Sequence, residues 1–455
     1  AIINKEKIGI ITDYDVDGST SAAVLYNFLS SLGCNCFIKV PDRLKEGYGP
    51  NKRLIDELLE KKINLIFTLD CGTTSFDIFN YSNSNLVDII IIDHHISELK
   101  FPEVFSIINP NRHDEFNSLK ELAAVGITFL FITALRKKLR EKNFFNSSNK
   151  EPNLLSYLDL VALGTVCDVV KLTSYNRIFV SKGLEIIKKR THKGISKIID
   201  NTKFNHSPTS SDLGYIVGPQ LNAASRISDS TLSFKILISN DLNEIELISK
   251  KLQLLNEKRK LIENEILNQS FEQAKNQVNK KYILVHGFGW HKGVLGIVAS
   301  KLVEKYNKPS FVISTDTSFG FGSARSVNNI DLGKIILNAK LQGILVSGGG
   351  HKMAAGIKIN KDSITLFDKY LFSTFDNIDL SFFEKNNYFD LEISINEINE
   401  NLLSYIEMFE PFGNGNREPN FIIKGLKIDS IKKIKNKHIL FFFKTDFDVK
   451  IKGIC

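Results

Sequence analysis

The feature that most constrains the fold is a set of short, continuously apolar runs in the first hundred residues. They cover residues 8–12, 36–40, 63–69 and 87–92 and are rich in Ile, Leu and Val. Continuous rather than alternating apolarity is typical of strands buried on both faces, as in a parallel sheet with helices on each side. A helical pattern at residues 19–32 separates the first two runs. This alternation of strand and helix predicts an α/β domain.

The composition is that of an ordinary globular protein with more than one domain. The chain has 455 residues, of which 43% are hydrophobic and 24% charged, which excludes the disordered, collagen-like and disulfide-stapled classes. The apolar runs are too short to span a bilayer. The five cysteines form no C-x-x-C pair, which favours reduced thiols in a cytoplasmic protein. The net charge of +8 permits an acidic partner such as nucleic acid without requiring one.

The rest of the chain divides into further segments. Residues 1–240 are expected to form the first domain, which is mainly helical from about residue 120. Residues 241–279 contain no Pro or Gly, which predicts one long helix that connects two domains. The alternative is two ordinary helices joined by a break. Residues 280–378 begin a second α/β pattern. Residues 379–455 carry short strand patterns at 388–393, 420–423 and 438–444, which indicate a small β domain. Because the chain starts at Ala1 and stops at Cys455 just after a strand pattern, we expect further protein at both ends.

Acidic and imidazole side chains follow three of the expected strands. The first strand runs into Asp13, Asp15 and Asp17, the third into Asp70, and the fourth into the sequence Asp93-His94-His95. In an open α/β sheet the carboxyl ends of parallel strands meet at one edge, where ligands bind. A single Asp after a strand is more often a helix N-cap, but three such strand ends together favour a common site. Asp168, after a helical run, is a fourth candidate.

So many carboxylates in one place predict a metal site. Uncompensated, they would repel one another, and burying them would cost several kcal/mol each. Oxygen ligands with one imidazole suit Mn²⁺ or Mg²⁺. The candidate ligands include no cysteine, which argues against a structural zinc site. The number of acids predicts two metals, ~3.5–4 Å apart, which would lower the pKa of a shared water. Asp15 and Asp17 lie two apart, and Gly18 gives room for a tight turn from strand to helix. Asp70 is placed to bridge the two metals, and Asp93 is expected to orient a ligand.

These residues are similar to a known family. Asp15-Val-Asp17-Gly, Asp70-Cys-Gly, Asp93-His-His and Thr165-Val-Cys-Asp168 resemble the DHH phosphoesterase superfamily. Further segments resemble, in the same order, the bacterial RecJ exonucleases, which are specific for single-stranded DNA; these segments are 41–49, 218–226, 289–302, 322–326, 348–356 and 411–416. The resemblance implies a DHH domain, a DHHA1 domain from about 280 and an OB-fold, a small β-barrel, from about 380.

The resemblance also implies roles for individual residues. Metal ligands would be Asp15, Asp17, Asp70, His94 and Asp168. His95 would face the scissile phosphate and Asp13 would support the site. The DNA strand would be held near its 5′ end by Arg226, His291, Arg325, Ser326 and a loop of Gly348, Gly349, Gly350 and His351.

Several of these residues also have simpler interpretations. Taken alone, Arg226 and Arg325 fit ordinary ion pairs better than phosphate contacts, and the glycines fit a flexible turn. Trp290 is equally suited to stacking on a base and to packing in the core. The last 35 residues interleave lysines with Phe441, Phe442 and Phe443, which suits single-strand binding but also a filled barrel with solvated edges.

The sequence therefore predicts a metal-dependent 5′→3′ exonuclease for single-stranded DNA that releases 5′-mononucleotides. Its polarity, its role in DNA repair and recombination, and a helicase and a single-strand-binding protein as partners are implied by the resemblance alone. We expect a cytoplasmic monomer without a membrane anchor. The alternatives are a DHH phosphodiesterase of short oligonucleotides or cyclic dinucleotides, and a catalytically inactive DNA-binding relative.

Overall fold

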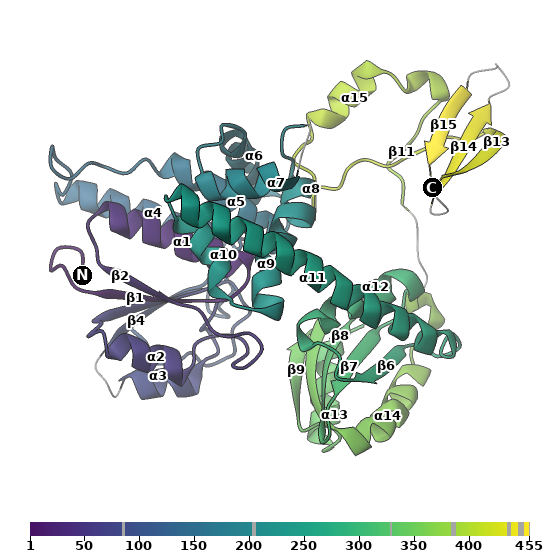
Figure 1. Cartoon of the computed structure of the whole chain (residues 1–455), viewed down its shortest axis with the longest axis horizontal. Coiled ribbons are helices and arrows are strands. Elements are labelled where there is room, and N and C mark those ends of the chain that lie inside the picture. Colours follow the sequence, from purple (N-terminus) through teal and green to yellow (C-terminus); the bar gives the residue numbers. More distant parts are fainter. Residues whose placement is uncertain are drawn as a thin grey trace. The chain divides into compact units, whose positions relative to one another are not determined.

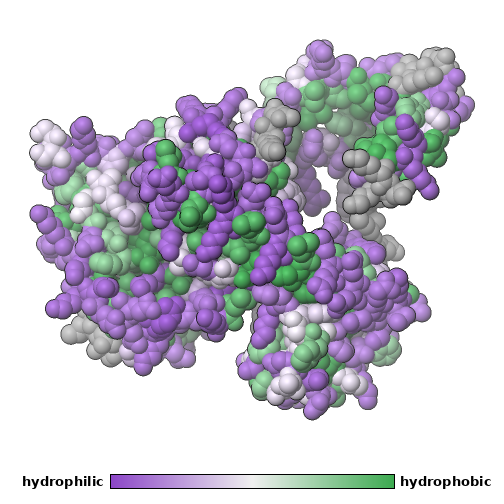
Figure 2. All heavy atoms as spheres, viewed as in Figure 1, coloured by the Kyte–Doolittle hydropathy of each residue, from purple (hydrophilic) through white to green (hydrophobic). Residues whose placement is uncertain are grey.

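The structure, a computed structural model, describes residues 1–83, 87–202, 206–327, 330–383, 388–434, 438–444 and 450–454. It falls into two units, residues 1–385 and 386–455. In the part of the chain described, no helix is long and apolar enough to cross a membrane. Hydrophilic residues cover most of the face that Figure 2 shows.

The first unit opens with a five-stranded, wholly parallel sheet in the order β2-β1-β3-β4-β5. Its strands are β1 (Ile8–Thr12), β2 (Cys36–Lys39), β3 (Leu65–Leu69), β4 (Asp88–Ile92) and β5 (Ser106–Ile108). The sequence predicted the first four strands within two residues at either end, and it did not predict β5. The predicted α/β fold with a parallel sheet is confirmed.

Helices cover both faces of this sheet. On one face lie α2 (Lys52–Leu59) and α3 (Phe76–Asn83), whose Leu54, Leu58 and Phe79 pack against Ile66 of β3 (Figure 1). On the other face lies α1 (Val16–Ser31), packed against a group of helices. These are α4 (Ala124–Glu141), α5 (Leu158–Cys167), α6 (Ser174–Lys188), α7 (Lys193–Thr202), α8 (Ser210–Asp212), α9 (Gly218–Ile227) and α10 (Thr231–Ile238). Burial on both faces explains why the strands are continuously apolar.

One helix, α11 (Leu242–Lys275), follows without a break, so the alternative of two helices is wrong. Its first half packs against α7, α9 and α10, and its second half against α12 (Leu295–Tyr306) and β6 (Ile283–Phe288). It therefore connects the parallel-sheet region to a second α/β region, as the sequence predicted.

The second α/β region has a five-stranded mixed sheet in the order β6-β7-β8-β10-β9. The other strands are β7 (Ser310–Thr315), β8 (Phe319–Arg325), β9 (Ser347–His351) and β10 (Ala354–Asn360), and the other helices are α13 (Leu332–Leu341) and α14 (Ile364–Asp376). Gly348, Gly349 and Gly350 lie within the edge strand β9, so the predicted loop is wrong at these positions. A glycine run carries no apolar alternation, and pairing with β10 makes it a strand.

Trp290 packs in the core of this region. Its side chain is 7% exposed, and Nε1 donates a hydrogen bond to Gln269 Oε1 of α11 at 2.7 Å. A Cβ atom at Gly287 would lie 2.1 Å from the indole ring, so the glycine makes room for it. The structure thus favours the packing role over base stacking.

The second unit contains a short helix and two small sheets in the described residues. Its elements are β11 (Leu391–Glu392), α15 (Glu400–Glu407), β12 (Phe421–Ile422), β13 (Lys427–Ile434), β14 (His438–Lys444) and β15 (Lys450–Ile454). On β14 the rings of Phe441 and Phe443 are stacked at 5.7 Å, while Lys452 lies 6.0 Å from the ring of Phe442. Part of the last 35 residues, in which lysines and phenylalanines are interleaved, lies outside the described residues: Lys435, Lys437, Asp446, Phe447, Asp448 and Cys455.

Candidate metal centre

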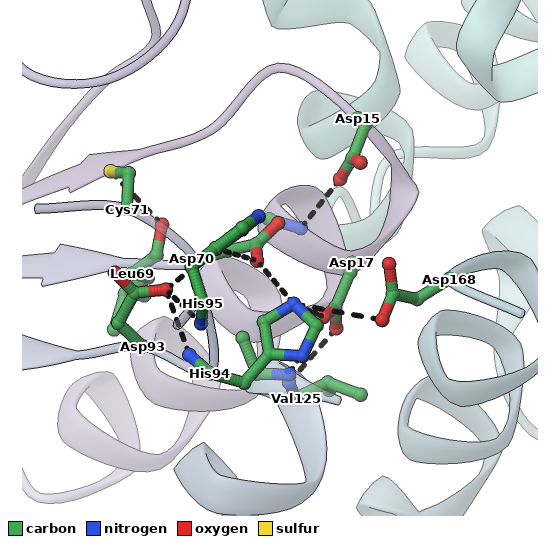
Figure 3. Close-up of polar contacts among 12 residues, drawn as sticks. Asp15, Asp17, Leu69, Asp70, Cys71, Asp93, His94, His95, Val125 and Asp168 are labelled. Carbon is green, nitrogen blue, oxygen red and sulfur yellow. Dashed lines mark hydrogen bonds and ion pairs between the residues drawn. The ribbon is translucent and has the colours of Figure 1, made fainter. Parts of the chain in front are cut away.

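The candidate centre lies at the carboxyl ends of the parallel strands. The sheet order reverses direction between β1 and β3, and ligands bind at such a switch point. Asp13 follows β1, Asp70 follows β3 and Asp93 follows β4, and their backbone N–H groups continue the ladder by donating to the next strand. The strand ends bring together the side chains that the sequence predicted, and Figure 3 shows several of them converging from separate elements.

The loop from β1 to α1 and the first turn of α1 together supply three acids. The Asp15 carboxylate caps α1 by accepting a hydrogen bond from Gly18 N at 3.0 Å. A Cβ atom at Gly18 would lie 2.5 Å from Asp13 O, so the tight turn requires glycine. Asp17 is buried and accepts from the backbone N–H groups of Ala124 and Val125, at 2.7 and 2.9 Å, where α4 begins. The acid therefore fixes the first turn of α4 as well as facing the site.

Asp70 occupies the centre of the cluster. It is 2% exposed and has a left-handed backbone, with φ of 59°, which is uncommon outside glycine. Its Oδ1 lies 3.3 Å from His94 Nε2. Strained backbone at a buried acid is found where the surrounding structure fixes the conformation, as at functional sites.

Asp93 holds the two histidines rather than joining the cluster. Its Oδ1 accepts hydrogen bonds from His94 N at 2.7 Å and His95 N at 3.1 Å and lies 2.8 Å from His95 Nδ1. Its Oδ2 accepts from the backbone and hydroxyl of Thr73 at 3.1 and 2.7 Å. Burial opposes ionisation of Asp93, but the hydrogen bonds from His95 and Thr73 outweigh it and hold the pKa of this carboxyl below its usual range.

Asp168 comes from the other side of the site, at the end of α5. Its Oδ2 lies 3.6 Å from His94 Nε2. The approach of α5 to α1 depends on Gly164, because a Cβ atom there would lie 2.2 Å from Thr20 Oγ1. A helix end 98 positions away from Asp70 in the sequence thus completes the cluster.

The geometry defines groups of three residues whose ligand atoms lie within 4.8 Å of one another. They are Asp70, His94 and His95; Asp17, His94 and Asp168; and Asp13, Asp15 and Asp70. Buried atoms without a hydrogen-bond partner among the described residues include Asp13 Oδ1, Asp70 Oδ1 and His94 Nε2. Unpartnered buried acceptors among carboxylates fit a divalent cation, because only a cation would offset the cost of burying them.

Burial raises the pKa of three carboxyl groups of the cluster, those of Asp17, Asp70 and Asp168. Burial, reinforced by the charge of Asp15, raises the pKa of Asp17 to about 7. Burial, reinforced by the charges of Asp17 and Asp15, raises the pKa of Asp168 to about 9. Burial also raises the pKa of Asp70 well above its usual range. Nearby positive charge would restore the ionised forms.

Residues that the sequence did not single out also build the site. The Tyr48 hydroxyl donates to Asp70 O at 2.9 Å and lies 3.0 Å from His95 Nδ1. Asn109, directly after β5, donates to Thr73 Oγ1 and His95 O, at 2.9 and 2.8 Å. Tyr48 lies in segment 41–49, one of the segments that resemble RecJ proteins. Asn109 directly follows the last strand of the sheet, β5, so its position at the site could be expected only once that strand is known.

The predicted DNA contacts lie in the second α/β region and at the end of α9. Arg226 Nη1 donates to Gly293 O at 3.1 Å. Burial, and then the charges of Arg43, Arg259 and Arg325, lower the pKa of Arg226 to about 9. Guanidinium groups that repel one another in this way favour an anion between them.

The remaining predicted contacts differ in what their side chains do. His291 Nδ1 accepts from Gly293 N at 3.2 Å, and His351 is exposed at the end of β9. Ser326 is 4% exposed and its hydroxyl donates to Ile330 O at 2.8 Å, so this hydroxyl already has a partner inside the fold.

Three protein families match successive parts of the chain: the parallel-sheet region, the second α/β region and the second unit. The DHH family N-terminal domain matches residues 7–165, the DHHA1 domain residues 279–376 and the RecJ OB domain residues 389–455. The single-stranded-DNA-specific exonuclease RecJ of Haemophilus influenzae is 32% identical over 92% of this chain and 74% of that protein. The chain belongs to the RecJ family.

Other RecJ proteins give the same result. The Bacillus subtilis RecJ is 30% identical, and the match covers 95% of this chain but 54% of that protein. The crystal structure of Thermus thermophilus RecJ in complex with Mn²⁺ has a TM-score of 0.85 at 25% identity, covering all of this chain and 64% of that one. A manganese-bound exonuclease RecJ has a TM-score of 0.70 at 28% identity, over 83% of this chain. These matches confirm the predicted family and its three kinds of domain.

Proposed function

We propose that this RecJ-family chain degrades single-stranded DNA from the 5′ end, hydrolysing phosphodiester bonds with two divalent cations and releasing 5′-mononucleotides. The observation that carries the proposal is the cluster of carboxylates and imidazoles with unpartnered buried ligand atoms, in a chain similar to manganese-bound RecJ. The domain boundaries at 240, 279 and 378 and the roles below belong to the proposal.

The proposed ligands are Asp15, Asp17, Asp70, His94 and Asp168, and Asp13 and His95 lie close enough to join them. Two Mn²⁺ or Mg²⁺ ions at this cluster would lower the pKa of water and polarise the scissile phosphate. Asp70 belongs to two of the groups of three, which fits its predicted bridging position.

The other residues bind and orient. Asp93 and Tyr48 both lie at Nδ1 of His95, which leaves Nε2 for the scissile phosphate. This ring is 48% exposed, so substrate can reach it. Arg226 and Arg325 are the proposed phosphate contacts, with His291, His351 and the backbone of Gly348–Gly350 beside them. We do not assign Ser326 to the DNA because its hydroxyl is directed inward.

The experiment compares substrates in the presence of Mn²⁺. Single strands labelled at either end, duplexes and dinucleotides are incubated with the wild type, Asp70→Ala and the surface control Asp88→Asn. Mononucleotides released first from the 5′ end, by wild type and control but not by Asp70→Ala, would support the proposal. Preference for dinucleotides would support a short-oligonucleotide phosphodiesterase, and binding without hydrolysis an inactive relative.

We also propose a helicase and a single-strand-binding protein as partners, and the cytoplasm as the compartment. A helicase would supply single strands to a nuclease that cannot open a duplex, and a single-strand-binding protein would cover them. Cys34, Cys36, Cys71 and Cys167 are free thiols, in keeping with the reducing cytoplasm that the sequence predicts.

A further inference from the structure

The outer face of the second sheet is organised in three rows across its strands β9, β10 and β8. Residues that pair directly across strands lie on the same face, and so do residues two apart along a strand. The alternate residues of β10, Ala355, Ile357 and Ile359, are buried in the core below. The rows are His351–Ala354–Arg325, Gly349–Gly356–Ser323 and Ser347–Lys358–Phe321.

The first row contains proposed phosphate contacts, and the second row forms an open surface beside it. Arg325 and His351 stand in the first row. In the second row, a Cβ atom added at Gly349 or Gly356 would meet no atom within 4 Å. Since a strand rises about 3.3 Å per residue, the third row lies roughly 13 Å from the first across an open glycine surface.

The third row carries positive charge on an aromatic ring. Lys292 Nζ lies 3.2 Å from the ring centroid of Phe321, while Lys358 Nζ lies 4.7 Å from that of Phe319 and 5.7 Å from that of Phe321. Among the described residues neither ammonium group forms a salt bridge or a hydrogen bond, but the charges of both help to lower the pKa of Asp316, so one carboxylate lies near them. Two ammonium groups beside a single carboxylate keep a net positive charge, which favours an anionic ligand.

A cavity of about 940 Å³ joins this row to the parallel-sheet region of the same unit. Its lining includes Lys292, Phe321 and Lys358 on one side and Arg43 and Lys45 from the 41–49 segment on the other. Glu46 also lines it, but the guanidinium of Arg53 holds that carboxylate through bonds of 2.6 and 2.8 Å. The cavity is therefore cationic.

We propose that Lys292, Phe321 and Lys358 form a second phosphate subsite, which binds a phosphodiester of the single strand away from the bond being cut. This inference rests on the proposed function, because the first row must hold the strand near its 5′ end. Phe321 positions Lys292 and, with Phe319, Lys358, and the strand crosses the second row at Gly349 and Gly356, where no side chain obstructs it. Its continuity with Arg325 and His351 on one face favours nucleic acid over an unrelated acidic ligand.

The test is a binding measurement that does not depend on turnover. Fluorescence anisotropy in Ca²⁺ is used to measure the affinity of 5′-phosphorylated thymidine oligonucleotides of two and of twelve nucleotides, over a range of salt. The variants are the double substitution Lys292→Gln/Lys358→Gln and the single substitution Phe321→Leu. The control is Lys334→Gln, an exposed lysine on α13, whose helix packs in the core behind the sheet.

The double variant should bind the twelve-nucleotide strand more weakly, and its slope of log affinity against log salt should be shallower by about 0.7, the value for one lost phosphate contact. Phe321→Leu should weaken the same strand in part. The dinucleotide, which is too short to reach the third row, should bind all proteins equally. Unchanged affinity and slope for the long strand in the double variant would overturn the inference.

The two proposals fail in different ways. If the wild type degrades single strands while the double variant binds them normally, the second subsite is wrong and the proposed function stands. If the wild type neither binds nor degrades single strands of either length, the proposed function fails and the subsite fails with it. Thermal unfolding of each variant identifies any loss of binding caused by misfolding.

Discussion

Replacing Asp93 with Asn tests whether this carboxylate holds the two histidines in place. The side chain is 1% exposed and its oxygens accept four backbone or hydroxyl hydrogen bonds besides the contact with His95 Nδ1. Asn has nearly the same shape, but its amide nitrogen cannot accept a hydrogen bond. The substitution therefore removes acceptors without creating a cavity.

The loss of unfolding free energy in Asp93→Asn depends on which carboxylate oxygen the amide nitrogen replaces. At Oδ1 it would face three donors from His94 and His95, so the less costly orientation places it at Oδ2. There the Thr73 hydroxyl can turn to accept, but the Thr73 N–H group remains buried without a partner, which costs about 1–3 kcal/mol. Loss of charge from the remaining bonds adds about 1 kcal/mol. The free energy of unfolding should fall by about 2–4 kcal/mol at pH 7.

The pH dependence gives the effect a second signature. Hydrogen bonds hold the pKa of Asp93 below its usual range in the folded protein, so the carboxylate contributes stability above the unfolded value of about 4. That contribution is lost as pH falls through the lower folded value. The difference in unfolding free energy between wild type and Asp93→Asn should therefore shrink below about pH 4.

Urea unfolding of both proteins at several pH values is the assay, with Asp88→Asn as control. Asp88 is exposed at the start of β4, so its substitution should change stability by less than about 0.5 kcal/mol. Turnover of single-stranded DNA by Asp93→Asn should fall by about 10–100-fold, as is typical when a residue that orients metal ligands is replaced. If Asp93→Asn is as stable and as active as Asp88→Asn, this reasoning is refuted.

Three further predictions concern the cluster itself. Asp70→Asn should lose Mn²⁺ affinity, measured by calorimetry, while keeping its circular dichroism spectrum, and unchanged affinity would contradict its central position. Burial raises the pKa of Asp17 to about 7 and of Asp168 to about 9 in the folded protein, whereas both carboxyl groups ionise near pH 4 when the chain is unfolded. The free energy of unfolding, measured with a chelator present, should therefore fall as pH rises from about 4 to about 9. Mn²⁺ should then raise Tm more at pH 9 than at pH 6, and equal shifts would show that these groups are not at the metals. Gly18→Ala should lower stability by more than about 2 kcal/mol, since the new Cβ would lie 2.5 Å from Asp13 O, and wild-type stability in thermal denaturation would count against the tight turn.

The sequence predicted the centre of the site because strand ends obey a topological rule. Asp13, Asp70 and Asp93 each follow a strand with an unmistakable apolar run, so their convergence required only that the strands be parallel and adjacent. Asn109 escaped prediction because β5 has three residues, too few for a pattern. Tyr48 escaped as a site residue because its contacts with Asp70 and His95 depend on how a loop folds back.

In the second α/β region, sequence patterns were less informative. Gly348–Gly350 gives no apolar signal, and only the cross-strand pairing with β10 makes it a strand. Ser326 stands beside Arg325, yet alternation along the chain directs its hydroxyl inward to Ile330. The row formed by Lys358 and Phe321 joins residues 37 positions apart, which only the register of β8 and β10 brings together.

We propose that acids from separate strand ends and one helix end form a single binding site for two cations. Anomalous diffraction from a crystal grown with Mn²⁺ tests it most directly. Two peaks are expected beside Asp70, one toward Asp15 and the other toward His94 and Asp168, and both should vanish in Asp70→Ala crystals grown the same way. Peaks located away from this cluster, or none in the wild type at saturating Mn²⁺, would contradict a two-cation site here.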